Sequence, residues 1–232
     1  MPKFFVTSDI HSFYIQLIDA LNKAGFDKDN EDHWLVVCGD CFDRGPDTRK
    51  VFDYLQSLQR KVIVRGNHEL LLVDCCLREY TMSHDIHNGT AKTIIGLGDG
   101  DTFAEKCKST LSKFRPFLKQ TVNYFETKNY IFAHSWVPVW VRDWRKASQK
   151  EWNEVVWENP FRMIEDGLLP DKTIVFGHCS CSEAWAKAEG RTMYGDDAKF
   201  EPYYGDGYIA IDSLTYYTGI KNVIVIEDDF IA

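Results

Sequence analysis

Residues 34–45 read WLVVCGDCFDRG, a short apolar run that turns abruptly into glycines and charged residues. The apolar part, residues 34–38, has the length and composition of a buried β-strand. Asp40, Asp43 and Arg44 follow immediately after it. Because ligands bind at the carboxyl ends of strands in open α/β sheets, this stretch predicts a sheet strand with a functional site at its end.

The chain on either side of this stretch alternates between strand-like and helix-like patterns. Apolar runs at residues 3–8 and 61–65 predict two further strands. Apolar side chains spaced three and four residues apart predict helices at residues 13–24, 47–58 and 69–78. This β-α-β-α-β order implies parallel strands covered by helices, which places the chain in the α/β class.

The remainder of the chain is less regular and becomes richer in strands toward its end. Residues 81–120 are expected to be helical with loops, whereas residues 136–170 show no clean periodicity. Long irregular segments in compact domains are often functional. Further strands are expected at residues 121–126, 129–133, 173–176, 208–211 and 222–227. The length of 232 residues suits one catalytic domain over residues 1–232.

The composition limits the classes of function. Hydrophobic residues make up 44% and charged residues 27%, the balance of a soluble globular protein. A net charge of −8 argues against broad nucleic-acid binding. No apolar run is long enough to span a bilayer, so no membrane partner is expected. The seven cysteines include the adjacent pair Cys75 and Cys76. An odd number with such a pair fits a reducing cytoplasm better than a disulfide framework.

Polar residues with metal-binding side chains follow five of the expected strands. They are Asp9 and His11, then Asp40, then Asn67 and His68, then His134, and finally His178. Carboxylate, imidazole and amide ligands suit divalent ions such as manganese, iron or zinc. One aspartate shared between two ions would place them about 3.5–4 Å apart, as in two-metal hydrolytic sites. The adjacent Gly39, Gly45, Gly66 and Gly177 are expected to let the backbone turn sharply there.

Each of these motifs has a plainer interpretation when it is taken alone. An Asp-x-His sequence can be a helix cap beside a surface histidine, and a Gly-His pair proves nothing. The pair Cys179 and Cys181 could hold a metal, but no second pair of cysteines or histidines lies at zinc-site spacing. The complete set, in which each motif directly follows an apolar run, is the observation that indicates a site.

These residues resemble the phosphoprotein phosphatase branch of the calcineurin-like metallophosphoesterases over residues 3–227. The family pattern G-D-x-H-G, G-D-x-x-D-R-G, G-N-H-E, His and G-H corresponds here to residues 8–12, 39–45, 66–69, 134 and 177–178. Compact bacterial and bacteriophage members have a similar length. The resemblance implies a sandwich of two mixed β-sheets flanked by helices, with the site at one edge.

The resemblance also implies a role for each site residue. Asp9 and His11 would bind the first metal ion and Asp40 would bridge both ions. The ligands of the second ion would be Asn67, His134 and His178. His68, oriented by Asp43, would protonate the leaving group, and Arg44 would grip the phosphate. The two divalent ions would be Mn²⁺, with Fe or Zn as alternatives, and would supply hydroxide from a bound water.

Three departures from the family pattern bear on the site. Ser8 and Ser12 stand where the family has glycines, which questions the shape of the loop but not the ligands. Ser135 and Trp136 follow His134 in place of small residues, which predicts a narrower site.

The third departure concerns phosphate binding. The family's W-x-R is Trp157-Glu158-Asn159 here, so a second arginine is missing. Arg162 could replace it, because Pro160 can open a helix and place Arg162 in the first turn. The alternative is a solvated surface arginine.

The sequence favours a phosphomonoesterase that acts on phosphoserine and phosphothreonine in proteins. A symmetrical diadenosine tetraphosphate hydrolase ranks second, because those relatives typically have G-N-H-D and lack the aspartate before Arg-Gly, whereas this chain has Glu69 and Asp43. A nucleotide or polynucleotide phosphatase shares both motifs, but the acidic charge weighs against it. A noncatalytic metal-binding protein should have lost ligands or the proton donor, and all are present.

Overall fold

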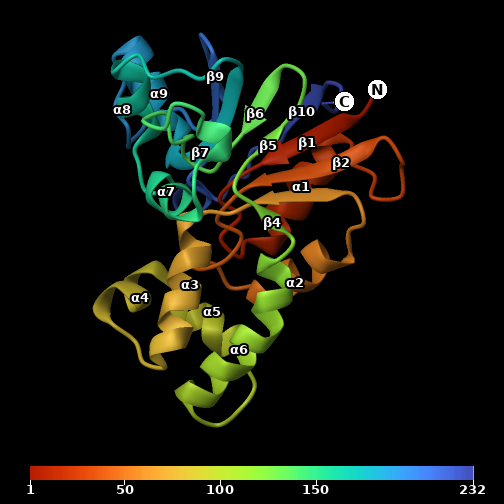
Figure 1. Ribbon diagram of the computed structural model, residues 1–232, viewed down its shortest axis with the longest axis vertical. Coiled ribbons are helices and arrows are strands. Elements are labelled where there is room, and N and C mark those ends of the chain that lie inside the picture. Colours follow the sequence, from red (N-terminus) through yellow and green to blue (C-terminus); the bar gives the residue numbers. More distant parts are fainter. Residues whose placement is uncertain (232) are drawn as a thin grey trace.

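Two five-stranded sheets pack against each other in the computed structural model, which describes residues 1–231 (Figure 1). The strands of the first sheet are β1 (Lys3–Thr7), β2 (His33–Cys38), β3 (Lys61–Val64), β4 (Thr121–Val122) and β10 (Ile224–Glu227). Those of the second are β5 (Phe125–Glu126), β6 (Tyr130–Phe132), β7 (Thr173–Ser180), β8 (Tyr203–Gly205) and β9 (Tyr208–Asp212). The strand orders are β10-β1-β2-β3-β4 and β5-β6-β7-β9-β8.

Both sheets are mixed. In the first, β1 to β4 run parallel and β10 pairs antiparallel with β1. In the second, β6, β7 and β9 are parallel and the edge strands β5 and β8 are antiparallel to their neighbours. The predicted parallel β-α-β-α-β start and the expected sandwich of two mixed sheets flanked by helices are therefore confirmed.

The strands of the first sheet are apolar on both faces because both faces are covered. Phe4 and Val6 point between the sheets, where they pack in one cluster with Phe132 and Val175 of the second sheet. Phe5, which lies between them in β1, packs instead with the helices on the outer face. Parallel strands buried on both sides read as continuous apolar runs, which is why the sequence showed no polar alternation there.

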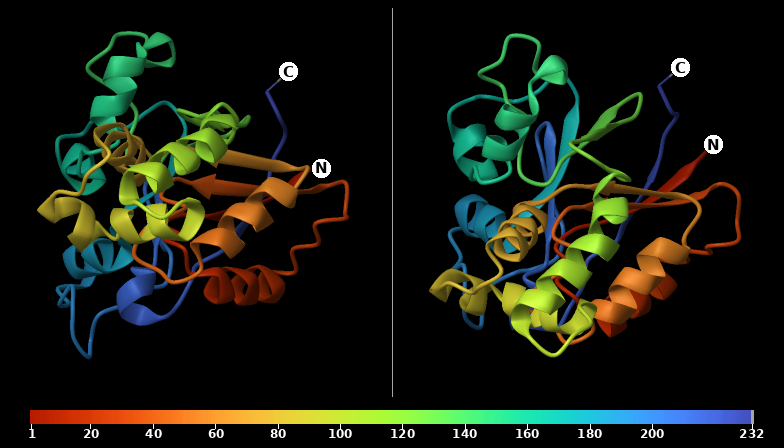
Figure 2. Two further views of the ribbon diagram at one scale, coloured as in Figure 1. Left: turned by 90° about the horizontal axis from the view of Figure 1, so that it is seen from below. Right: turned by 60° about the horizontal axis from the view of Figure 1, so that its bottom comes forward.

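Helices cover the outer faces. Those of the first half are α1 (Tyr14–Ala24), α2 (Thr48–Ser57), α3 (Asn67–Arg78), α4 (Ser83–Asn88), α5 (Thr90–Leu97) and α6 (Phe103–Leu118). The second half contributes α7 (Gln149–Val155), α8 (Pro160–Glu165), α9 (Cys181–Glu189) and α10 (Thr215–Thr218), with a short 3₁₀ turn at Trp144–Lys146. Figures 1 and 2 show α3 to α6 gathered at one end of the molecule. None of the helices within residues 1–231 is long and apolar enough to span a membrane.

Some predicted elements differ from the structure. Residues 121–126 form two short strands in different sheets, because β4 pairs with β3 whereas β5 pairs with β6. The predicted strand at 173–176 continues to Ser180 through an irregularity that carries His178. The strand β8 and the helices α7, α9 and α10 were not predicted. The helix α6 lies within the segment expected to be helical, and the Thr102–Glu105 capping box at its start was a readable signal.

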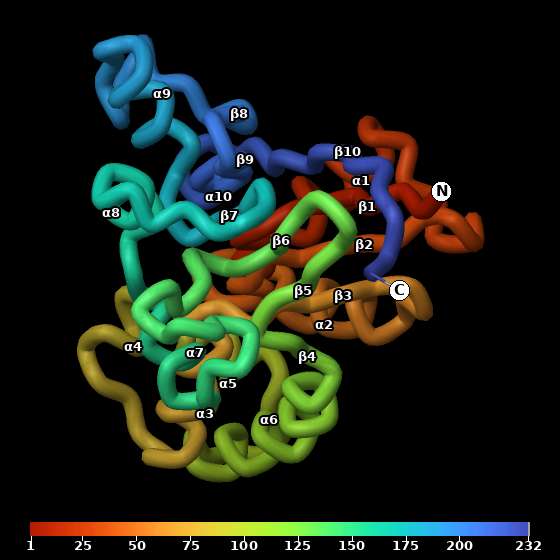
Figure 3. The backbone as a smooth tube through the Cα atoms, turned by 45° about the horizontal axis from the view of Figure 1, so that its top comes forward, coloured from red at the N-terminus to blue at the C-terminus, as the bar shows by residue number. Residues whose placement is uncertain are grey.

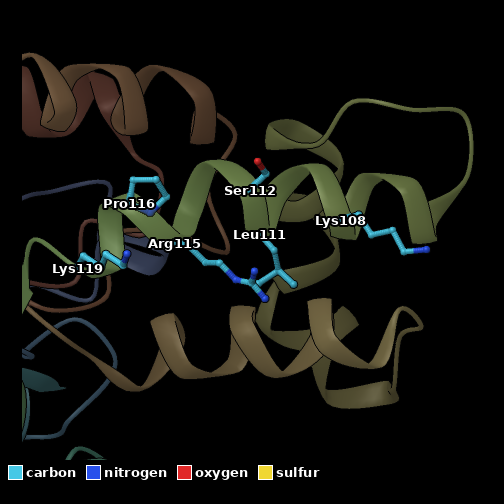
Figure 4. Close-up of a pocket in the computed structure, with 6 residues that line it drawn as sticks. All are labelled: Lys108, Leu111, Ser112, Arg115, Pro116 and Lys119. Carbon is cyan, nitrogen blue, oxygen red and sulfur yellow. The ribbon is translucent and has the colours of Figure 1, made fainter.

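A groove of about 410 Å³ runs along α6, away from the strand ends (Figure 4). Figure 4 shows Leu111 and Arg115 extending from one side of this helix and Ser112 from another. Lys108, Pro116 and Lys119 complete the lining. Because this groove contains none of the predicted site residues, its size alone does not mark the site.

Candidate metal centre

Asp40, directly after β2, lies between two groups of potential ligands. Its Oδ2 is 3.7 Å from Nε2 of His11 and 3.8 Å from Nε2 of His68. Its Oδ1 is 3.5 Å from Nε2 of His134. The residue is only 2% exposed. A carboxylate that presents one oxygen to each group has the arrangement of a ligand shared by two ions.

The first group joins Asp9 and His11 from the loop after β1. Oδ1 of Asp9 is 3.8 Å from Nε2 of His11. The Nδ1 atom of His11 lies 2.8 Å from the Phe42 carbonyl, which fixes the proton on Nδ1 and leaves Nε2 as the nitrogen that can accept a hydrogen bond or bind a metal ion. Burial, then the nearby Arg44 guanidinium, holds the pKa of His11 well below its usual range. A neutral imidazole is the form that binds metal.

The second group joins Asn67 of α3, His134 after β6 and His178 of β7. Nε2 of His134 is 2.8 Å from Oδ1 of Asn67 and 3.1 Å from Nδ1 of His178, which is 3.2 Å from the same Oδ1. Donor atoms about 2.1 Å from one ion lie roughly 3 Å apart, so these three atoms fit a single cation. The Cys38 carbonyl, 2.9 Å from Nδ1 of His134, fixes its tautomer. Burial and His134 lower the pKa of His178 to about 3.

The charges of both groups fit divalent cations. Clusters of His11, Asp40 and His68, and of Asp40, His134 and His178, each bring their donor atoms within 4.8 Å of one another. Burial, and then the negative charge of Asp9, raises the pKa of the Asp40 carboxyl well above its ordinary value, although His68 opposes the shift. A cation beside this carboxylate would offset the cost of its burial.

His68 and Asp43 form a separate hydrogen-bonded pair. Nδ1 of His68 lies 2.7 Å from Oδ2 of Asp43, and that oxygen also accepts a hydrogen bond from the Thr90 hydroxyl at 2.7 Å. Burial acts to lower the pKa of His68, but the Asp40 and Asp43 carboxylates outweigh it and raise the pKa above its ordinary value. The ring therefore keeps a proton on Nδ1 and directs Nε2 toward Arg44, whose Nη2 is 3.3 Å away.

The backbone at the site adopts conformations that non-glycine residues rarely take. The φ angles of Asp9 and His11 are both 47°, and those of Asp40, Asp43 and His178 are 55°, 74° and 65°. Such left-handed residues persist only where the surroundings hold them, and they concentrate at functional sites. The aiming of the ligands therefore depends on strained turns at the strand ends.

The expected role of the glycines is only partly correct. Gly39 has a φ of 78° and needs the freedom of glycine. Gly66 and Gly177 do not have positive φ, but a Cβ atom there would overlap the carboxylates of Asp40 and Asp9 respectively. Gly45 is confined in the same way by the backbone of residues 11 and 12. Three of these four glycines are thus required for space and not for a turn.

Glu69 is a site residue whose role sequence reasoning missed. Its side chain is fully buried and accepts hydrogen bonds from the backbone N–H groups of Gly66 at 2.8 Å, Asp40 at 3.0 Å and Cys41 at 2.9 Å. It therefore fastens the loop after β2 to the start of α3. The G-N-H-E sequence at a helix start, where a glutamate can reach back to the preceding backbone, was the available signal.

Lys221 is a second residue that the sequence did not reveal. Its buried ammonium group donates to the carbonyl of Ser8 at 2.8 Å and to that of Asp9 at 2.6 Å. Burial lowers the pKa of this lysine. Because 212 residues separate Lys221 from Asp9, no local pattern could have linked them.

The departures from the family pattern have simple structural explanations. Ser12 has a φ of 59°, so it takes the conformation a glycine would take, and its hydroxyl lies 3.0 Å from that of Thr48. Trp136 is buried against Phe176 with its indole N–H bonded to the Leu168 carbonyl. The expectation that Trp136 narrows the site was therefore wrong, because the ring points into the core.

Arg44 lies inside the site, whereas Arg162 does not contact it. Arg44 Nη1 is 2.8 Å from Nε2 of His11. Pro160 opens α8 and Arg162 lies in its first turn, as expected, while Asn159 caps the helix by accepting from the Phe161 and Arg162 amides. Within residues 1–231 the Arg162 side chain is exposed and forms no hydrogen bond or ion pair with the site, so its phosphate-binding role stays a prediction.

The cysteine pair does not join these donor groups, although Cys179 directly follows His178. The Cys181 thiol donates to the Ala210 carbonyl at 3.1 Å, and burial raises the pKa of Cys179 to about 12. Neither residue belongs to a potential metal cluster among the described residues. Such unreactive thiols are typical of structural cysteines.

Comparison with known proteins identifies a matching family and several similar proteins. The sequence profile of the calcineurin-like phosphoesterase family matches residues 2–209. The symmetrical bis(5'-nucleosyl)-tetraphosphatase of Buchnera aphidicola subsp. Acyrthosiphon pisum is 43% identical over 74 residues, 32% of this chain and 26% of that protein. The enzyme of that name from Aeromonas salmonicida is 46% identical over 66 residues, 28% of this chain and 23% of that protein. The similar segment thus spans about a quarter of these relatives.

Solved structures share the fold at low sequence identity. A protein described as a candidate diadenosine tetraphosphatase superposes with a TM-score of 0.57 at 19% identity, covering 97% of this chain and 95% of that one. A cold-active protein-tyrosine phosphatase of a psychrophilic Shewanella species gives a TM-score of 0.57 at 16% identity, covering 98% and 76%. At these identities the likeness establishes the fold and not the substrate.

Proposed function

Because the chain belongs to the calcineurin-like phosphoesterase family, we propose that it is a two-metal hydrolase that cleaves dinucleoside polyphosphates symmetrically. The observation that carries the choice of substrate is the local similarity to symmetrical bis(5'-nucleosyl)-tetraphosphatases. This choice reverses the order that the sequence alone favoured, where a protein serine/threonine phosphatase came first. The metal-dependent phosphoesterase activity itself is common to both.

We assign each of these residues a task in that reaction. Two divalent cations, held by Asp9, His11 and Asp40 and by Asp40, Asn67, His134 and His178, would supply hydroxide near neutral pH and offset phosphoryl charge. We assign to Arg44 the binding of phosphoryl oxygens, because a guanidinium offers parallel donors that match phosphate geometry.

The His68–Asp43 pair would complete the reaction by proton transfer. His68 would donate a proton from Nε2 to the departing oxygen, while Asp43 holds the Nδ1 proton in place at 2.7 Å. The His68–Asp43 contact also supports a second candidate function.

The second candidate is the hydrolysis of phosphomonoesters, including phosphoserine and phosphothreonine in proteins. The specific observation that favours it is the buried His68–Asp43 contact. A serine or threonine alkoxide is a poor leaving group that needs a proton, whereas a nucleoside diphosphate leaves with much less help. A built proton donor is therefore more valuable for alkyl esters than for anhydrides.

The two candidates are separated by parallel assays of the purified protein with manganese. The substrates are diadenosine tetraphosphate, a phosphoserine peptide, a 5'-phosphorylated oligonucleotide and para-nitrophenyl phosphate, with products resolved by chromatography. We expect diadenosine tetraphosphate to give the highest kcat/KM and ADP as its only nucleotide product. Efficient dephosphorylation of the peptide without turnover of the dinucleotide would establish the second candidate instead, and an Asp40→Asn preparation controls for contaminating phosphatases.

A further inference from the structure

An exposed tyrosine packs against the arginine that we assign to phosphate binding. The Arg44 guanidinium lies over the ring of Tyr216, 5.0 Å from its centroid. Tyr216 is in α10, which directly follows β9 (Figure 3), and it remains 54% exposed. One face of the ring is therefore covered by Arg44 while much of the rest faces solvent. Because Arg44 also contacts His11, the ring lies next to the candidate metal ligands.

The backbone that carries Tyr216 is firmly anchored. The Leu214 amide donates to Asp212 at 2.8 Å, and the Ser213 hydroxyl donates to the Ile220 carbonyl at 2.8 Å. The Thr218 hydroxyl closes the turn by donating to the Ser213 carbonyl at 2.9 Å. Lys221, at the end of the segment, holds the carbonyl groups of Ser8 and Asp9 in the loop of the metal ligands.

This anchoring of the backbone lowers the entropic cost of binding a ligand to Tyr216. A ring on a fixed backbone has few torsions to immobilise, so it can offer contact area at low entropic cost. The link through Lys221 also fixes the position of the ring relative to the metal ligands. A ligand that contacts both the Tyr216 ring and the metal ligands would therefore find the two at a fixed separation.

The aromatic surface continues away from the metal centre. Tyr217 follows Tyr216 and is 56% exposed, and its ring centroid is 6.0 Å from that of Tyr194, which is 54% exposed. Phe200 lies on another side of Tyr217 at 5.8 Å. Tyr217 therefore connects α10 to the segment between α9 and β8 through aromatic contacts.

We propose that Tyr216 is a stacking platform for the nucleobase of a nucleotide bound by its phosphate at Arg44. The proposal rests on the proposed function only in taking the substrate to be a nucleotide. The base would stack on the ring face opposite the guanidinium, which gives an arginine–tyrosine–base arrangement. Base–aromatic stacking accepts every base, so this platform selects nucleotides over other phosphate esters without choosing among adenine, guanine and the pyrimidines.

The test compares two phosphate esters that differ only in the base. AMP and ribose 5-phosphate are measured as competitive inhibitors of para-nitrophenyl phosphate hydrolysis at fixed manganese concentration. We expect the wild-type protein to bind AMP about 5- to 10-fold more tightly, at the lower end for base stacking on a partly exposed ring. Tyr216→Leu should bring this ratio close to one, and Tyr216→Phe should preserve it because the ring remains.

Tyr80 supplies the matched control. It is another exposed tyrosine beside an arginine, with the Arg78 guanidinium 5.7 Å from its centroid, but it follows the far end of α3 from His68. Tyr80→Leu should leave the AMP preference unchanged. Thermal melting of each variant confirms that the fold is retained.

Two results would overturn the platform: equal binding of AMP and ribose 5-phosphate by the wild-type protein, or an AMP preference that survives in Tyr216→Leu. The proposed function fails differently. If diadenosine tetraphosphate is not cleaved while the AMP preference depends on Tyr216, the platform stands and the natural substrate is another nucleotide ester. If the dinucleotide is cleaved but Tyr216→Leu keeps the preference, the function stands and the platform is lost.

Discussion

Replacing Glu69 by alanine should destabilise the fold and weaken metal binding together. The Glu69 carboxylate is fully buried and accepts three backbone hydrogen bonds, from Gly66, Asp40 and Cys41. Alanine would leave these donors without a partner in a region that water does not reach. Because the Asp40 amide is one of them, the Asp40 carboxylate would lose part of its support as well.

The size of the effect follows from the number of donors. A hydrogen bond to a charged group contributes about 1.5–3 kcal/mol, but removing the carboxylate also relieves the cost of burying its charge. We therefore expect Glu69→Ala to lower the free energy of unfolding by about 3–5 kcal/mol, because three buried donors would each lose a partner at about 1–3 kcal/mol while the loss of the buried charge offsets part of that cost. Glu69→Gln should lose about 1–3 kcal/mol, since its remaining oxygen can still accept the bonds from Gly66 and Asp40.

Urea unfolding followed by tryptophan fluorescence measures the loss, once in chelator and once with manganese. Glu105 is the control, because it occupies the same third position of a capping box at the start of α6 but is exposed. Glu105→Ala should shift the urea midpoint much less. Calorimetry should show weaker manganese binding in Glu69→Ala only. If Glu69→Ala and Glu105→Ala shift the midpoint equally, the bonding network does not hold the site.

Four further changes test the assigned roles. Asp40→Asn should lose more bound metal and activity than His11→Asn, because Asp40 faces both ligand groups. In chelator, Asp40→Asn should be more stable than the wild-type protein, since a buried charge is gone. Two tightly held ions in Asp40→Asn would contradict the bridging role. His68→Asn should retain its metal but lose about 10²–10⁴-fold in turnover of alkyl phosphates, and much less for para-nitrophenyl phosphate; equal losses would exclude an acid role. Asp43→Asn removes a carboxylate that raises the pKa of His68, so the alkaline limb of the pH–kcat profile should move to lower pH, and an unmoved limb would assign it to another group. Arg162→Ala should raise KM for phosphomonoesters several-fold if the exposed side chain reaches bound phosphate, whereas wild-type KM and phosphate inhibition would leave Arg44 as the arginine that binds it.

The sequence predicted the first sheet well because its signals are local. Residues 34–45 contain an apolar strand, its end and three charged residues in one continuous stretch. The helices α1 and α2 have clear spacing, and Gly25 ends α1 in a left-handed conformation. The strands β4 and β5 were merged because a change of partner sheet leaves no mark on a run of alternating residues. The short helices α7 and α10 carry too few residues for their spacing to be read.

The candidate ligands could also be identified from local motifs, but the residues that hold their loops in place could not. Motifs at strand ends named the residues that the structure brings together around Asp40. Glu69 and Lys221 act on backbone groups of other segments. Tyr216 contacts Arg44, which lies 172 positions earlier in the chain. Contacts of this kind depend on the packing of the two sheets, which no single stretch of sequence determines.

The strain at the site explains why those distant supports are needed. Left-handed non-glycine residues cost of order 1–3 kcal/mol each, and several of them lie within the motifs that carry Asp9, Asp40 and His178. The candidate ligands also include the buried carboxylates of Asp9 and Asp40, which repel each other and have lost hydration when no cation lies between them. Glu69 and Lys221 hold the backbone where the ligands alone would relax it. The loop geometry is therefore set by groups that do not bind metal, and substitutions at those groups should change metal affinity while every ligand remains in the chain.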